Sequence, residues 1–107
     1  MKIGIILGTN EPEVVWNAFR FGNTSLKANH EVKVFLINEG VEIEDIKNEK
    51  YNVKEQVNSF IENKGQILSC GTCLKSRDKE GSNVCLVSTM EELLKLVEES
   101  EKVLTFG

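Results

Sequence analysis

One strand-to-helix junction decides the fold class of this chain: Gln66-Ile67-Leu68-Ser69, then Cys70-Gly71-Thr72-Cys73, then Leu74-Lys75-Ser76-Arg77. The first four residues are typical of a short buried strand, and the last four of the opening turns of a helix. Cys70 and Cys73 therefore come at or just after the carboxyl end of a strand, where open α/β sheets place their chemistry. The amino end of a helix exposes unpaired N–H groups, which together with Lys75 and Arg77 favour a thiolate.

The segments on either side of this junction alternate between strands and helices. Apolar runs predict further strands over residues 2–8, 31–38, 84–87 and 102–106. Because strands that alternate with helices form parallel sheets covered on both sides, the sequence predicts one α/β sandwich with a mainly parallel sheet of about five strands. Residues 1–107 contain no linker or internal repeat and are expected to form a single domain.

Capping residues mark where the helices begin and end. Asn10 is predicted to cap the first helix with Pro12 in its first turn, and Asn29 is predicted to end it. Capping boxes begin at Asn52 and at Thr89, and Gly65 is expected to end the helix that follows Asn52.

Apolar periodicity predicts which side chains of these helices are buried. In the last helix, four residues are expected to face inward: Met90, Leu93, Leu94 and Val97. Residues 39–51 are rich in charges and are predicted to form a polar connection.

Composition and charge exclude several classes of protein. The net charge of −4 and the lack of any run of Lys and Arg argue against direct binding of nucleic acid. No apolar stretch is long enough to span a membrane, and the apolar start is too short for a signal peptide. Three cysteines, an odd number, argue against a secreted disulfide framework. The protein is therefore expected to be cytoplasmic, with thiols that are catalytic, redox-active or metal-binding.

The order and spacing of several motifs together resemble the DsrE/DsrF-like family, which includes subunits of sulfur-relay complexes. The motifs that carry the resemblance are Glu11-Pro12-Glu13, Trp16-Asn17-Ala18-Phe19-Arg20, His30-Glu31-Val32-Lys33-Val34-Phe35-Leu36, Gly40-Val41-Glu42, Cys70-Gly71-Thr72-Cys73-Leu74-Lys75-Ser76-Arg77, Met90-Glu91-Glu92-Leu93 and Lys102-Val103-Leu104-Thr105-Phe106. The resemblance covers nearly the whole chain. It implies a three-layer α/β/α fold and assembly into a trimer or hexamer.

The resemblance also implies a sulfur-carrying cysteine after the third strand, with a basic residue seven positions later. Cys70 and Arg77 have this spacing, so the carrier role falls on Cys70. Two residues depart from the pattern of relay subunits. Asp78 stands where a glycine commonly follows the arginine, and Cys73 has no counterpart in those subunits.

Each cysteine has more than one interpretation. Cys70 is either a persulfide carrier with an accessible thiolate or a small buried residue at a strand end. Cys73 either resolves the persulfide, forms a reversible disulfide with Cys70, or packs in the first helical turn. Cys85 lies in the apolar run Val84-Cys85-Leu86-Val87, and a core position is expected.

Other candidate sites carry less chemistry. His30 is the only histidine and is expected in a surface turn, and no second Cys-x-x-Cys pair completes a zinc site. No cofactor is expected.

The sequence therefore predicts a small cytoplasmic protein that relays sulfane sulfur as a persulfide on Cys70, with Lys75 and Arg77 as supporting charges. Its expected partners are further copies of itself and sulfur donor and acceptor proteins, with no membrane and no direct nucleic acid. If the protein itself transfers sulfur repeatedly from donor to acceptor, it is a sulfurtransferase. Two alternatives stay open: a dithiol redox or sensor protein that uses Cys70 and Cys73, or a non-catalytic oligomeric module with a metal-binding Cys-x-x-Cys.

Overall fold

The sheet has five strands, all of them parallel. A computed structural model describes residues 1–107, and its strands follow the spatial order β4-β3-β2-β1-β5. Their bounds are β1 Lys2–Leu7, β2 Glu31–Leu36, β3 Gln66–Cys70, β4 Leu86–Ser88 and β5 Lys102–Phe106. The predicted parallel sheet of about five strands is therefore confirmed. The fourth strand begins two residues later than the apolar run suggested.

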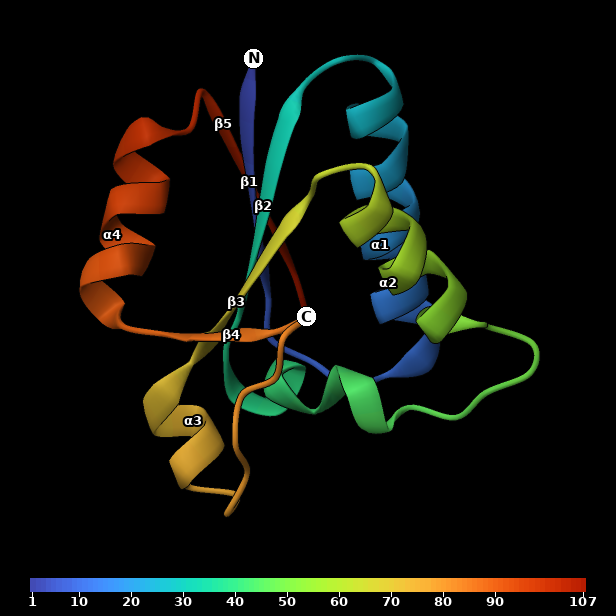
Figure 1. The fold of residues 1–107 in the computed structure, drawn as a ribbon, viewed down its shortest axis with the longest axis vertical. Coiled ribbons are helices and arrows are strands. Elements are labelled where there is room, and N and C mark those ends of the chain that lie inside the picture. Colours follow the sequence, from blue (N-terminus) through green and yellow to red (C-terminus); the bar gives the residue numbers. More distant parts are fainter.

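Helices lie on both faces of this sheet. They are α1 Pro12–Lys27, the 3-10 helix η1 Asn38–Asp45, α2 Val53–Glu62, α3 Gly71–Lys75 and α4 Met90–Glu99. Helices α1 and α2 cover one face, α4 covers the other, and α3 leaves the carboxyl end of β3 (Figure 1). The structure is therefore a three-layer α/β/α sandwich. None of its helices combines the length and apolarity that a bilayer crossing needs.

The layer of α1 and α2 packs around one aromatic side chain. Phe60 is fully buried and meets the ring of Phe19 edge-on at 5.3 Å between centroids. A Cβ at Gly22 would lie 2.9 Å from the Phe60 ring, and one at Gly65 would overlap it. Gly65 therefore leaves room for this ring. Helix α2 was predicted to end at Gly65, but it ends at Glu62 with Asn63 as its C-cap.

Most of the predicted helix ends are confirmed, but the start of α1 is not. Thr89 accepts a hydrogen bond from the Glu92 amide, as expected of a cap, and Asn29 follows the end of α1 in the left-handed region (φ 68°). The cap of α1, however, is Glu11, whose carboxylate accepts from the Val14 amide at 2.9 Å. Asn10 was predicted to cap this helix, and that prediction was wrong. Its side-chain amide instead donates a hydrogen bond to the Glu42 carboxylate.

Helix α4 has two apolar faces instead of one. Leu96 packs against the sheet, close to Gly4, where an added Cβ would come within 2.5 Å of the Leu96 side chain. Met90, Leu94 and Val97 were predicted to face inward, but they are 55%, 59% and 42% exposed. Residues at i, i+4 and i+7 share one helix face, and the centre of that face lies about a third of a turn around the helix from Leu96.

The predicted polar connection between β2 and α2 contains a structured segment. The 3-10 helix η1 buries Val41 and Ile43, which alternate with the charged residues Glu42 and Glu44. Because buried apolar residues and acidic residues alternate here, the sequence does not show the periodicity of a helix. Gly40 lets η1 pass close to the end of β1, where an added Cβ would overlap the Leu7 carbonyl oxygen.

Candidate functional site

The two cysteines of the strand-to-helix junction lie together at the carboxyl edge of the sheet. Cys70 is the last residue of β3 and caps α3, because its sulfur accepts a hydrogen bond from the Cys73 amide at 3.4 Å. The side chain lies among core residues and only 3% of Cys70 is exposed. The accessible thiolate expected at residue 70 is therefore wrong for the isolated chain. Cys70 points inward because it belongs to the strand.

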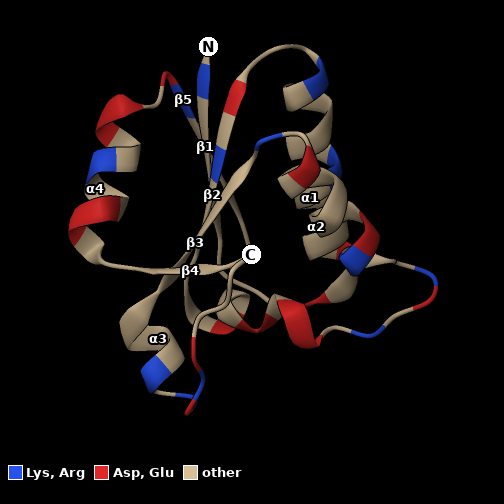
Figure 2. Ribbon diagram, in the orientation of Figure 1, with Lys and Arg blue, Asp and Glu red and all other residues tan.

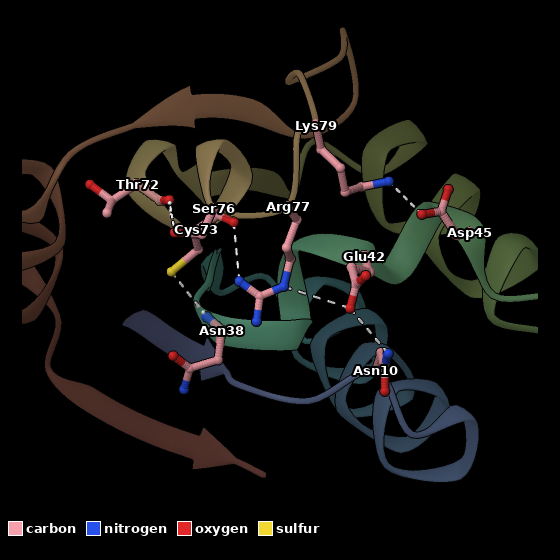
Figure 3. Close-up of polar contacts among 9 residues, drawn as sticks. All are labelled: Asn10, Asn38, Glu42, Asp45, Thr72, Cys73, Ser76, Arg77 and Lys79. Carbon is pink, nitrogen blue, oxygen red and sulfur yellow. Dashed lines mark hydrogen bonds and ion pairs between the residues drawn. The ribbon is translucent and has the colours of Figure 1, made fainter.

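Cys73 is the more accessible of the two thiols. It lies within the first turn of α3 and is partly exposed. Its sulfur accepts a hydrogen bond from the Asn38 amide at 3.2 Å, across the edge of the sheet from α3 (Figure 3). Asn38 adopts the left-handed region (φ 51°), a conformation that asparagine tolerates better than most residues. This turn connects β2 to η1 and places the Asn38 amide next to the Cys73 sulfur.

The two thiols are electrostatically linked. Burial raises the pKa of the Cys73 thiol, and a hydrogen bond to the Cys70 side chain and repulsion from Cys70 raise it further. The Asn38 amide and the Arg77 guanidinium act in the opposite direction, but the net direction is upward. Cys73 therefore holds its proton more tightly than an ordinary cysteine does.

Only one of the two predicted supporting cations contacts the pair. Arg77 donates to the Cys73 carbonyl oxygen at 3.1 Å and lies 3.8 Å from the Glu42 carboxylate. Glu42 also accepts a hydrogen bond from Asn10 at 3.2 Å (Figure 3). Lys75 is exposed and lines a shallow hollow between α3 and α4. The positive charge next to the thiols is therefore that of Arg77. The nearby Glu42 carboxylate partly neutralises this charge.

Acidic residues of η1 hold the segment that follows α3. Besides the contact of Glu42 with Arg77, Asp45 forms an ion pair with Lys79, and Glu44 accepts a hydrogen bond from the Ser82 hydroxyl at 2.7 Å. Figure 2 shows red, acidic positions along the ribbon between β2 and α2, which contains η1. Sequence reasoning missed this set because its two halves are more than thirty residues apart.

Asp78 occupies a left-handed backbone position. Its φ of 51° is one that glycine adopts without cost and that other residues adopt with strain. The glycine that the resemblance implies at this position would adopt this conformation without strain. Aspartate is among the residues that tolerate the conformation best, so the turn after Arg77 keeps its shape despite the substitution.

Cys85 belongs to the core, as predicted. It is buried, burial raises its pKa to about 12, and the neighbouring Glu44 carboxylate adds to the rise. In the unfolded chain the thiol ionises near its ordinary value of 9.0, so the unfolded state binds fewer protons than the folded state between about pH 9 and pH 12. Stability contributed by the neutral thiol is complete below pH 9 and is lost as the pH rises.

We therefore expect a steeper alkaline loss of stability in the wild type than in Cys85→Ala. The difference between their free energies of unfolding should change by up to about 1.4 kcal/mol per pH unit above pH 9. Urea unfolding of both proteins from pH 7 to pH 11 measures this difference. Parallel pH profiles for the two proteins would contradict it.

The single histidine lies at the opposite end of the sheet from the cysteines. His30 precedes β2, and its Nδ1 is 2.8 Å from the amino terminus of Met1. The carboxyl ends of the parallel strands carry Cys70, so topology separates the imidazole from the thiols. No group of three or more Cys, His, Asp and Glu side chains is gathered in a way that could hold a metal ion.

The position of the cysteine pair and the strand order prompt a comparison with known proteins. The profile of the DsrE/DsrF-like family matches residues 1–106. The chain belongs to this family. Among curated relatives, the uncharacterized protein MJ0989 of Methanocaldococcus jannaschii is 32% identical, over 99% of this chain and 100% of its own length. The uncharacterized protein MK0008 of Methanopyrus kandleri is also 32% identical, over 88% of this chain and 83% of its own.

A solved structure shares the fold of this DsrE/DsrF-like protein. A conserved protein of unknown function, BT1422 from Bacteroides thetaiotaomicron, superimposes with a TM-score of 0.77 and covers 97% of this chain and 93% of its own. Its sequence identity of 17% supports the likeness of fold alone. Family membership therefore confirms the resemblance identified in the sequence, and the roles of individual residues are inferred from the geometry of the site.

Proposed function

We propose that this DsrE/DsrF-like protein is a cytoplasmic sulfur carrier that holds sulfane sulfur as a persulfide on Cys70. One observation carries the proposal: the two cysteines meet at the carboxyl edge of the sheet, where the Cys70 sulfur accepts the Cys73 amide N–H. An amide donor stabilises a sulfur anion, whether thiolate or persulfide. Membership of a family that includes sulfur-relay subunits is consistent with this chemistry.

The proposed transfer needs no cofactor. A thiolate of the cysteine pair attacks the outer sulfur of a donor persulfide, a new S–S bond forms, and the S–S bond within the donor breaks. The donor leaves as a thiolate, and the sulfur is held as a persulfide on Cys70. The reverse step onto an acceptor thiolate completes the relay. Oxidation states balance, because one sulfur atom is exchanged between thiols. The donor and the acceptor are proteins in this proposal.

Intact-mass spectrometry after incubation with glutathione persulfide tests the proposal. Once the donor has been removed and the protein has been treated with an excess of glutathione, the wild type should retain one added sulfur atom, and Cys70→Ser should retain none. Cys85→Ala is the matched control, because its thiol is buried away from the site and should not affect retention. A wild type that gains no sulfur, or a Cys70→Ser variant that retains as much as the wild type, would refute the carrier role.

A dithiol redox protein is the second candidate, and the contact of the two cysteines across one helical turn favours it. In this case Cys70 and Cys73 lose two protons and two electrons to a disulfide substrate, which is reduced to two thiols. The mass would fall reversibly by two hydrogens, and either serine substitution would abolish the change. No sulfur adduct would form with the persulfide.

We also propose that the chain assembles with copies of itself through the outer face of α4. Met90, Leu94 and Val97 form an exposed apolar stripe there, and the edge strand β4 adds Leu86 and Val87. Contiguous exposed apolar side chains of this kind are typical of association surfaces. A second copy of the same chain is the proposed occupant, in a trimer or hexamer.

A further inference from the structure

We infer that sulfur enters and leaves through Cys73 and crosses within the chain to Cys70, which stores it. This inference rests on the proposed carrier function and divides it between the two thiols. Cys73 is the docking thiol and Cys70 is the sheltered one. The order of events follows from the burial, contacts and charges of the pair.

Accessibility separates the two sulfur atoms. Transfer from a donor protein requires the attacking sulfur to approach the donor S–S bond along its axis, so the thiol must be reachable by another macromolecule. Cys73 is partly exposed, whereas Cys70 is 3% exposed and belongs to the core cluster. A donor therefore meets Cys73 first. Loading Cys70 directly would require the end of β3 to open.

Contact between the thiols provides the internal step. Cys70 and Cys73 lie one helical turn apart, and the Cys73 amide donates to the Cys70 sulfur at 3.4 Å. A persulfide on Cys73 therefore carries its outer sulfur next to the Cys70 thiol. Exchange between residues three apart on a short helix needs side-chain rotation and no change in the sheet.

Two neighbouring groups offset part of the rise in the Cys73 pKa and so ease its departure as a thiolate. The Asn38 amide points at its sulfur, and the Arg77 guanidinium, bonded to the Cys73 carbonyl, adds positive charge. Both groups lower the cost of an anion at this atom. They are fixed by η1 and by Glu42, so they are in place before sulfur arrives.

The internal step balances without any further reagent. The Cys70 thiolate attacks the outer sulfur of the Cys73 persulfide, a new S–S bond forms on Cys70, and the S–S bond on Cys73 breaks. Cys73 is released as a thiolate and takes up the proton that Cys70 gave up. No electrons are gained or lost by the pair. Burial then protects the Cys70 persulfide, because small thiols in solution reach it only slowly.

A rapid-mixing experiment with glutathione persulfide separates loading from storage. Wild type, Cys70→Ser and Cys73→Ser are mixed with the donor, quenched with an alkylating agent and mapped by peptide mass. Loading of Cys73→Ser should be slower than that of the wild type by a factor of about ten or more, equivalent to about 1.4 kcal/mol of activation free energy. After a long incubation, however, its sulfur should be found on Cys70.

Cys70→Ser should load as fast as the wild type, with the sulfur on Cys73. It should then lose this sulfur to an added excess of glutathione, against which the wild type retains its own. Thermal unfolding of each variant, with Cys73→Ala as a second replacement, shows whether the fold is intact. Serine at residue 70 preserves a helix cap.

The outcomes distinguish this inference from the carrier function itself. If Cys73→Ser loads at the wild-type rate, Cys70 receives sulfur directly and the internal step is wrong, although the carrier function stands. If sulfur in the wild type stays on Cys73 and never reaches Cys70, both the storage role and the proposed position of the persulfide fail. If no variant gains sulfur, the carrier function fails, and this inference fails with it.

Discussion

Replacing Gly40 with alanine is expected to destabilise the protein by about 3 kcal/mol, the upper part of the range for overpacking a close contact. The new methyl group would overlap the carbonyl oxygen of Leu7, a backbone atom of a central strand that has no rotamer through which to move aside. The 3-10 helix η1 must therefore shift away from the sheet. Chemical denaturation of the purified variant measures the loss.

The same substitution should also affect sulfur loading. Gly40 donates to the Ile37 carbonyl at 2.8 Å, and Asn38 lies between these two residues, so a shift of η1 moves the amide that faces Cys73. Gly8→Ala is the matched control, because the nearest atoms to its added carbon would lie 3.6 Å away, an ordinary contact distance. Equal stability changes in the two variants would show that η1 is not held by this close approach.

Leu94→Glu is expected to convert the proposed trimer or hexamer into monomers. Leu94 is the most exposed member of the α4 stripe and lies between Met90 and Val97, so a carboxylate at this position would be buried in the contact. Burying an unpaired charge costs several kcal/mol in each copy. In the monomer the same side chain is 59% exposed, so the fold itself should tolerate the change.

Sedimentation velocity over a range of concentrations measures this effect. Lys95→Glu is the matched control, because it changes the charge of the same helix at an exposed residue outside the apolar stripe. It should leave the assembly intact. A wild type that sediments as a monomer at every concentration would show that a second copy does not cover this face.

The elements of the fold could be predicted from sequence because their signals are local. Residues 3–7 form a continuous apolar run, which a strand buried on both faces requires, and Thr89 and Asn52 cap their helices as predicted. The location of the cysteine pair is equally local. A strand that ends at Cys70 and a helix that begins at Gly71 bring both thiols to the carboxyl edge of any parallel sheet.

The details that decide the chemistry depend on tertiary contacts. The left-handed turn at Asn38 directs an amide at Cys73. No apolar pattern in the sequence predicts this turn. Burial of Cys70 follows from the packing on its strand, so its side-chain exposure could not be inferred from the motif. The outer face of α4 has the same periodicity as a core face, and sequence alone cannot separate the two.

The contacts between η1 and the segment after α3 have a consequence for how relatives diverge. Glu42 is close to Arg77, Asp45 pairs with Lys79, and both carboxylates lie on one short helix. Loss of one partner leaves the other charge unmatched beside the thiol turn, so substitutions in the two segments should occur together among homologues. Correlated replacement at residues 42 and 77, and at residues 45 and 79, would then trace lineages that preserve this cysteine pair.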